Sequence, residues 1–345
     1  MSTRAEKQGI ITWFRRNWAE HPLFSTAFAL VVMILFQTLA LGFDFPTFGR
    51  WLSTWCQNWI NILRNNANIG VIALGMTFVI ISGGIELAVG STLVAIGAVV
   101  MVAIDTSGKG WFLSWGLTGV PAYFLAIILG LAVGFVLGEL TGLLITKGKI
   151  PPFIATLGTM KICRSVTQQF MQGYNPVVPK GFLKIASTEI GGQMVMPIIY
   201  WLILAWILNL VAKHTAFGRH VYAVGSNERA AKLSGINVQR VKRLVYMLIG
   251  VLVAVSSILQ VSRIGAMDYA NAGSGYEMDA IAAVIVGGTS MSGGRGTIGG
   301  TVLGVLIIAV MNNLLNLLGV PPFLREAFKG IIVICAVLLQ KKEKN

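Results

Sequence analysis

A single carboxylate and a pair of glycines interrupt one of the most apolar stretches of this chain. Residues 81–91 read ISGGIELAVGS and contain Gly83, Gly84 and Glu86. Glycine costs about 1 kcal/mol relative to alanine inside a helix, so the pair predicts a helix break or a close helix contact. A carboxylate at membrane depth costs about 3 kcal/mol unless it meets a polar partner or a wet cavity. Glu86 therefore either reaches water from a helix end, or lines a hydrophilic path and holds a broken backbone.

A second glycine-rich segment has the same shape. Residues 283–310 again place a glycine pair, Gly287 and Gly288, between apolar runs. Transporters often contain two related halves whose broken helices meet at the substrate site. The topology below places both glycine segments on one side of the membrane, so an exact inverted repeat does not follow. Asn312 and Asn313 follow on the next apolar run, where amides either line a pathway or join helices.

Residues for catalysis or nucleotide binding do not form a recognisable site. Gly294, Gly296 and Gly299 match the spacing of a dinucleotide fingerprint, but a membrane helix follows them and no acidic residue stands about 20 positions on. The chain has no G-x-x-x-x-G-K-[ST] loop, and its three cysteines lack metal-ligand spacing. We predict that the chain is not an enzyme, binds no metal or cofactor, and leaves any ATP hydrolysis to another chain.

The composition identifies the elements that must position these residues. Of 345 residues, 55% are hydrophobic and only 12% are charged, about half the charged share of a soluble domain. Apolar runs of about 20 residues recur, which is the length of a membrane-spanning helix. The fold class is therefore an all-α polytopic membrane protein. About ten spans give a consistent topology, near residues 23–43, 66–82, 87–104, 120–146, 151–170, 196–212, 244–262, 280–292, 297–318 and 325–341.

Basic segments set the expected orientation. The N-terminal segment (1–22), the segment 213–243 and the tail (342–345) are basic and are predicted to be cytoplasmic. We therefore attribute the net charge of +14 to the basic segments that fix the orientation in the membrane, and not to binding of nucleic acid. Residues 151–170 carry two cations and form either a full span or a re-entrant element. Residues 280–318 form either one broken helix or two short ones.

Glycines at every fourth position predict close helix packing. Gly130, Gly134, Gly138 and Gly142 follow this spacing, as do Gly296, Gly300 and Gly304, and small residues let helix backbones approach in lipid. Glu139 lies inside the first series and needs a partner, for which Lys161 and Arg164 are the candidates.

The segment 213–243 contains a predicted short helix. Asn227 is suited to cap a helix over 227–233, Glu228 suits its first turn, and Gly235 suits its end. Such a helix suits docking to a soluble partner, or the segment is a solvated basic loop that only fixes topology.

Four motifs in order resemble one family. IALGMTFVIISGGIELAVGS (72–91), IPPFIATLGTM (150–160), GRHVYAVGSNERAAKLSGINVQRVK (218–242) and IVGGTSMSGGRGTIGGTVLGVLI (285–307) are similar to the permease subunits of bacterial ABC-type monosaccharide importers of the ribose, xylose, arabinose and galactose group. The resemblance covers nearly the whole chain and implies a single permease domain over 1–345. Where the family usually has GGIDLSVG, this chain has GGIELAVG. Ala88 therefore stands where the family usually has a serine, and the serine hydroxyl is absent.

The resemblance implies an architecture and a set of partners. The architecture is that of the vitamin-B12-importer-like (type II) ABC permeases, with about ten helices and discontinuous glycine-rich segments. The partners are a second permease copy, identical or different, a cytoplasmic ATPase with two nucleotide domains that holds ATP and Mg²⁺, and an extracytoplasmic sugar-binding protein at a bacterial inner membrane. The residues implied in coupling to the ATPase are Gly225, Asn227, Glu228, Ala230, Ala231, Ser234 and Gly235.

An ion-coupled secondary transporter is the alternative. It would use Glu86 and Glu139 as titrating or ion-binding carboxylates and would not need the helix within 225–236. Neither interpretation identifies the sugar from the sequence.

Overall fold

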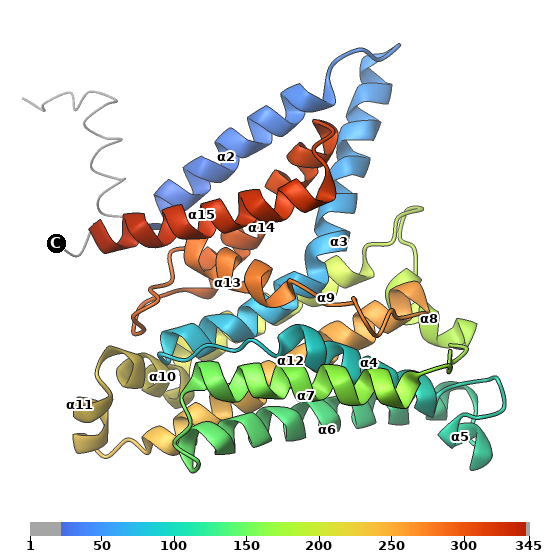
Figure 1. Ribbon diagram of the computed structural model, residues 1–345. Coiled ribbons are helices and arrows are strands. Elements are labelled where there is room, and N and C mark those ends of the chain that lie inside the picture. The colour runs from blue at the N-terminus through green and yellow to red at the C-terminus, as the bar shows by residue number, and fades with distance from the viewer. Residues whose placement is uncertain (1–21, 343–345) are drawn as a thin grey trace, which may run out of the picture.

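The computed structural model describes residues 22–342, and the regular elements in this range are helices (Figure 1). The expected cytoplasmic segments 1–22 and 342–345 lie outside the described residues except for residues 22 and 342. The helices are α2 (Pro22–Leu41), α3 (Phe48–Ile81), α4 (Val89–Ala103), α5 (Trp111–Ser114), α6 (Gly119–Thr146), α7 (Pro152–Met171), α8 (Lys180–Ser187), α9 (Met196–His214), α10 (Ala216–Ser226), α11 (Glu228–Leu233), α12 (Val238–Ile264), α13 (Tyr276–Val286), α14 (Ile298–Leu317) and α15 (Pro322–Lys342).

Six of the described helices are long and apolar enough to cross a membrane, judged by length and composition: α2, α3, α6, α9, α12 and α14. The apolar helix α4 is shorter. The structure is therefore that of an all-helical, polytopic membrane protein. The count of ten spans and the type II architecture stay predictions. In Figure 1, α11 and the last turn of α15 lie toward one end of the molecule, and α5 lies at the opposite end.

The first interior span is much longer than its apolar run. Helix α3 has 34 residues, about 51 Å at 1.5 Å per residue, and begins at Phe48 rather than near residue 66. Its polar first half is paired with other segments: the Gln57 side-chain amide donates to Gln193, in the loop between α8 and α9, at 2.8 Å, and Asn58 donates to Asn313 of α14 at 3.1 Å. Because these amides have hydrogen-bond partners, the helix continues through polar residues that hydropathy alone would not assign to the span.

The region 280–318 forms two helices rather than one broken helix. Helix α13 ends at Val286, and α14 begins at Ile298 after a glycine-rich loop. Residues 151–170 form the continuous helix α7, whose Arg164 guanidinium donates to the carbonyl oxygens of Ala272 and Tyr269 at 2.8 and 3.2 Å. These bonds fasten the irregular segment between α12 and α13 to α7.

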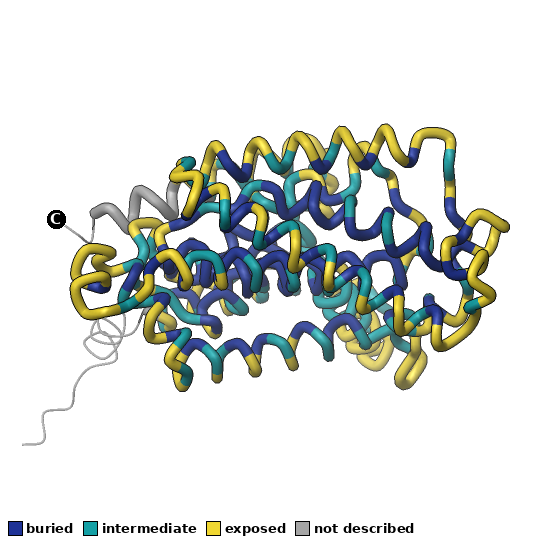
Figure 2. Tube along the Cα trace, turned by 90° about the horizontal axis from the view of Figure 1, so that it is seen from below, coloured by how far each residue is buried: buried dark blue, intermediate teal, exposed yellow. Residues whose placement is uncertain are grey.

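The glycine series of α6 packs against α12, as its spacing predicted. A Cβ placed on Gly134 would overlap the carbonyl oxygen of Gly250, and a Cβ on Gly250 would overlap that of Gly134. One helical turn away, Gly138 is equally close to the carbonyl of Tyr246. The two helices therefore touch through their backbones in the buried interior, which Figure 2 shows as dark blue between more exposed outer helices.

The predicted partners of Glu139 are wrong. Its carboxylate pairs with the guanidinium of Arg243 on α12, not with Lys161 or Arg164. The glycines on either side of Glu139 bring α6 against α12, so the nearest cation lies on that helix. Arg164 instead binds the backbone carbonyls described above.

A buried aspartate joins two loops at the end of the molecule that carries α5. Asp105 is 1% exposed and accepts hydrogen bonds from the Tyr174 hydroxyl at 2.6 Å and the Val177 N–H at 2.7 Å. It also accepts from the Ser107 hydroxyl and N–H. Burial opposes ionisation of this carboxyl, but the four hydrogen bonds prevail and lower its pKa.

Candidate functional site

The first helix break lies between α3 and α4, at residues 82–88. Gly83 turns the chain with φ +79°, a conformation that favours glycine. Glu86 is 5% exposed, and its carboxylate accepts a hydrogen bond from the Ala88 N–H at 2.6 Å. The Tyr246 hydroxyl of α12 donates to the Ile85 carbonyl at 3.1 Å. Glu86 thus lies inside the protein and holds the irregular backbone, while a role in transport stays a prediction.

Close packing surrounds the same break. A Cβ on Gly84 would lie 2.7 Å from the Tyr246 hydroxyl oxygen. Beside it, Glu86, Thr92, Thr141 and Tyr246 contribute to the lining of a cavity of about 10 Å³, roughly one water-sized sphere. Two glycines and one carboxylate therefore position α4 against α12 with little free space.

The second break separates α13 from α14. Helix α13 ends before Gly287, and Gly288 reverses the chain with φ +89°. A Cβ on Gly287 would overlap the carbonyl oxygen of Gly300, and a Cβ on Gly300 would overlap that of Gly287. This pair is the second case in which the predicted glycine spacing produces direct backbone packing.

The two breaks and α10 meet at one point. The Gly294 N–H donates to the Ile81 carbonyl at 2.8 Å, which joins the segment after α13 to the end of α3. A Cβ on Gly225 of α10 would overlap that same carbonyl oxygen and lie 2.7 Å from the Gly294 nitrogen. We call Ile81, Gly225 and Gly294 the glycine junction. It connects three segments that are far apart in the sequence through backbone atoms.

A tyrosine adds a side-chain contact to this junction. The Tyr222 hydroxyl of α10 donates to the Gly296 carbonyl at 2.8 Å. The sequence interpretation did not single out Tyr222 or Ile81. Only the glycines at 225, 293, 294 and 296 were available as a signal that backbones approach closely here.

The predicted short helix is present as α11. Asn227 caps it, because its side-chain oxygen accepts from the Ala230 N–H at 3.0 Å. Glu228 forms a 2.7 Å salt bridge with Lys242 of α12. Ala231 is 4% exposed and anchors the helix, Ser234 ends it, and Gly235 follows with φ +82°.

One apolar side chain of α11 points away from the protein. Leu233 is 90% exposed, and the neighbouring residues Arg229, Ala230, Lys232 and Ser234 are exposed as well. In Figure 1, α10 and α11 form the projection at one end of the molecule. Single exposed apolar residues are common on protein surfaces, so contact of α11 with another protein stays a prediction.

The two asparagines of α14 differ in their surroundings. Asn313 exchanges hydrogen bonds with Asn58 of α3 at 3.1 and 3.0 Å, so it joins helices. The side-chain oxygen of Asn312 is buried without a hydrogen-bond partner among the described residues. The geometry therefore assigns interhelical contact to Asn313 and leaves a pathway role for Asn312 as a prediction. Between residues 22 and 342, no group of three or more His, Cys, Asp or Glu side chains could hold a metal ion.

Comparison with known proteins identifies the family. Residues 58–337 match the family described as branched-chain amino acid transport system / permease component. The chain belongs to this permease family. It is 46% identical over 296 residues to the ribose import permease protein RbsC of Bacillus subtilis (strain 168), an alignment that covers 83% of this chain and 85% of that protein.

Two further relatives extend the similarity. The ribose import permease protein RbsC of Escherichia coli (strain K12) is 38% identical over 299 residues, covering 84% of this chain and 87% of the relative. The xylose transport system permease protein XylH of the same strain is 32% identical over 380 residues, covering 92% of each. No solved structure matches the chain. These relatives confirm the resemblance to sugar-importer permeases, and the chain is a multi-pass membrane protein.

Proposed function

We propose that this chain is the permease subunit of an ATP-driven importer and forms the translocation path for a monosaccharide. The observation that carries the proposal is the similarity, over more than four fifths of the chain, to permeases named for ribose and xylose import. An extracytoplasmic binding protein would deliver the sugar. A second permease copy would complete the path, and a separate ATPase would bind ATP and Mg²⁺, because this chain has no phosphate-binding loop.

The α10–α11 segment is the proposed contact with the ATPase. Its exposed Leu233 offers an apolar contact, and the exposed Arg229 and Lys232 offer charges to an acidic partner surface. The glycine junction continues from this segment into both helix breaks. A displacement of α10 would therefore act directly on the backbone after α3 and on the loop before α14, which is the coupling that an ATP-driven importer requires.

The carboxylates that an ion-coupled transporter would use are already engaged. Glu86 accepts a backbone hydrogen bond at the first break, and Glu139 pairs with Arg243. This arrangement supports a structural role for both, which favours the ATP-driven importer over the ion-coupled alternative.

Co-purification tests the ATPase contact. Leu233→Asp places a charge at the exposed tip of α11, and Ile190→Asp makes the same change at a 54% exposed residue in the loop between α8 and α9. We expect the chain purified in mild detergent from its native membrane to retain a stoichiometric ATPase, which mass spectrometry would identify. L233D should lose it and I190D should keep it. Retention by both variants would contradict docking at α11.

Transport tests the function itself. Vesicles that contain the chain with its co-purified partners should accumulate labelled ribose or xylose when ATP and the binding protein are supplied. Accumulation driven by a proton or sodium gradient without ATP would overturn the proposal and make Glu86 the leading coupling residue.

A further inference from the structure

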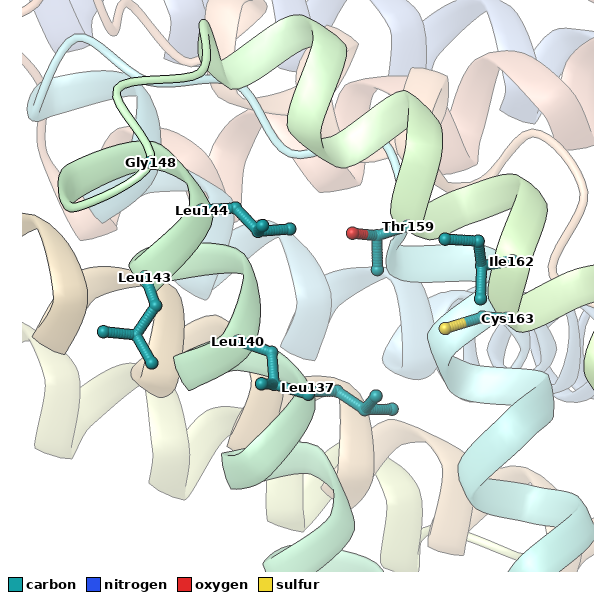
Figure 3. Close-up of a pocket in the computed structure, with 8 residues that line it drawn as sticks. All are labelled: Leu137, Leu140, Leu143, Leu144, Gly148, Thr159, Ile162 and Cys163. Carbon is teal, nitrogen blue, oxygen red and sulfur yellow. The ribbon is translucent and has the colours of Figure 1, made fainter.

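An apolar groove opens between α6 and α7. Its walls are four leucines of α6 and Thr159, Ile162 and Cys163 of α7, and its volume is about 380 Å³. Figure 3 shows Leu140 and Leu144 facing Thr159 and Ile162 across this space. Leu140 is 51% exposed and Ile162 is 64% exposed, so the groove opens on the outer surface of the helices, where the bilayer lies.

The length of the groove matches one leaflet. It extends from Gly148, in the turn after α6, to Leu137, a distance of about 16 Å at 1.5 Å per residue. The hydrocarbon core of a bilayer is about 30 Å thick. A groove of this length reaches from one membrane surface to about the midplane, which is the depth of a single acyl chain.

The end of the groove at the turn after α6 is basic. Lys147 and Lys149 flank the lining residue Gly148 and are both exposed, and neither forms a salt bridge within residues 22–342. The excess of lysine and arginine in this turn and in 213–243 predicts that it lies on the cytoplasmic side. That leaflet contains anionic lipids, and basic pockets between membrane helices on that side bind anionic headgroups.

We propose that this groove binds one anionic phospholipid. An acyl chain lies between α6 and α7, against the leucines and Ile162, and the headgroup phosphate lies beside Lys147 and Lys149. The combination of a one-leaflet apolar groove with two unpaired cations at its surface end favours a lipid over a helix of a second copy, which would leave both lysines without a counter-charge. The proposal does not depend on which solute the protein transports.

Native mass spectrometry of the full chain in mild detergent tests the headgroup contact, with phosphatidylglycerol and phosphatidylcholine added separately. Each lysine near an anionic surface contributes about 1 kcal/mol, so two lysines correspond to a preference of about 30-fold. The wild type should bind one phosphatidylglycerol with a preference of this order. The double variant K147Q/K149Q should still bind lipid but lose most of the preference. Equal binding of both lipids by the wild type would overturn the proposal.

A filled groove tests the acyl-chain contact. Leu140→Trp places an indole in the groove, and Val136→Trp makes a comparable change at a 51% exposed residue of α6 that does not line it. L140W should lose the bound lipid and V136W should retain it, with similar thermal unfolding. Unchanged lipid binding by L140W would overturn the proposal. Loss of a dimer without loss of lipid would also overturn it and assign the groove to a second copy.

Discussion

The glycine junction can be tested by adding one methyl group. Gly225→Ala would place a Cβ on the Ile81 carbonyl oxygen and 2.7 Å from the Gly294 nitrogen. Both neighbours are backbone atoms, so no side-chain rotation can relieve the overlap. The segments must separate, and the 2.8 Å bond from Gly294 to Ile81 breaks with them.

The expected loss of stability follows from these two effects. Overpacking a well-packed interior costs typically 1–3 kcal/mol, and a backbone hydrogen bond contributes about 1 kcal/mol. We expect G225A to lower the free energy of unfolding by about 2–4 kcal/mol. In the assembled importer, it should also impair transport while leaving the exposed face of α11 available to the ATPase.

Thermal unfolding in detergent measures the effect, and the chain supplies a matched control. Gly158 of α7 is helical, and a Cβ there would meet nothing within 4 Å. Gly158→Ala should therefore be neutral or stabilising by up to about 1 kcal/mol. If G225A unfolds at the same temperature as G158A, the three segments are not packed through their backbones and the reasoning is refuted.

Three further predictions concern other contacts. Because the pKa of Asp105 is lowered in the folded state, its contribution to stability is present above the unfolded value near 3.9 and is lost as the pH falls through the folded pKa. Asp105→Asn should be less stable at neutral pH and change less between pH 5 and pH 3, and parallel melting curves would contradict this. Gly134→Val should destabilise the protein by about 1–3 kcal/mol because it separates α6 from α12. Gly158→Val should not destabilise it, and equal melting temperatures of the two variants would argue against the contact. Glu139→Gln should lower the melting temperature by leaving Arg243 without its charge partner, and E139Q/R243Q should recover part of the loss; no recovery would mean that the two side chains are not coupled.

The sequence was most informative where a pattern reflects a local rule. Glycines four residues apart predicted backbone packing, and they pack against α12 and α13 because small residues have that effect in any helix pair. The capped helix at 227–233 was equally local, since Asn227, Glu228 and Gly235 act on their own neighbours. The predicted and observed elements agree within a few residues at both places.

Pairing between distant residues could not be predicted in the same way. The predicted start of α3 near residue 66 is wrong because hydropathy detects only the apolar part of the helix. Gln57 and Asn58 are stabilised by amides more than 130 positions away, which hydropathy does not detect. The partner of Glu139 was missed for a related reason. Arg164 was a candidate by its place within an apolar stretch, but the choice between it and Arg243 depends on which helix α6 packs against.

The backbone contact between Gly134 and Gly250 has a consequence for mutagenesis. Scanning with alanine normally removes atoms and asks what is lost, but neither residue has a side chain to remove. Alanine substitutions of the larger residues around them would measure only the packing of those residues. Screens that delete groups are therefore blind to this part of the interior, and only substitutions that add atoms can locate it.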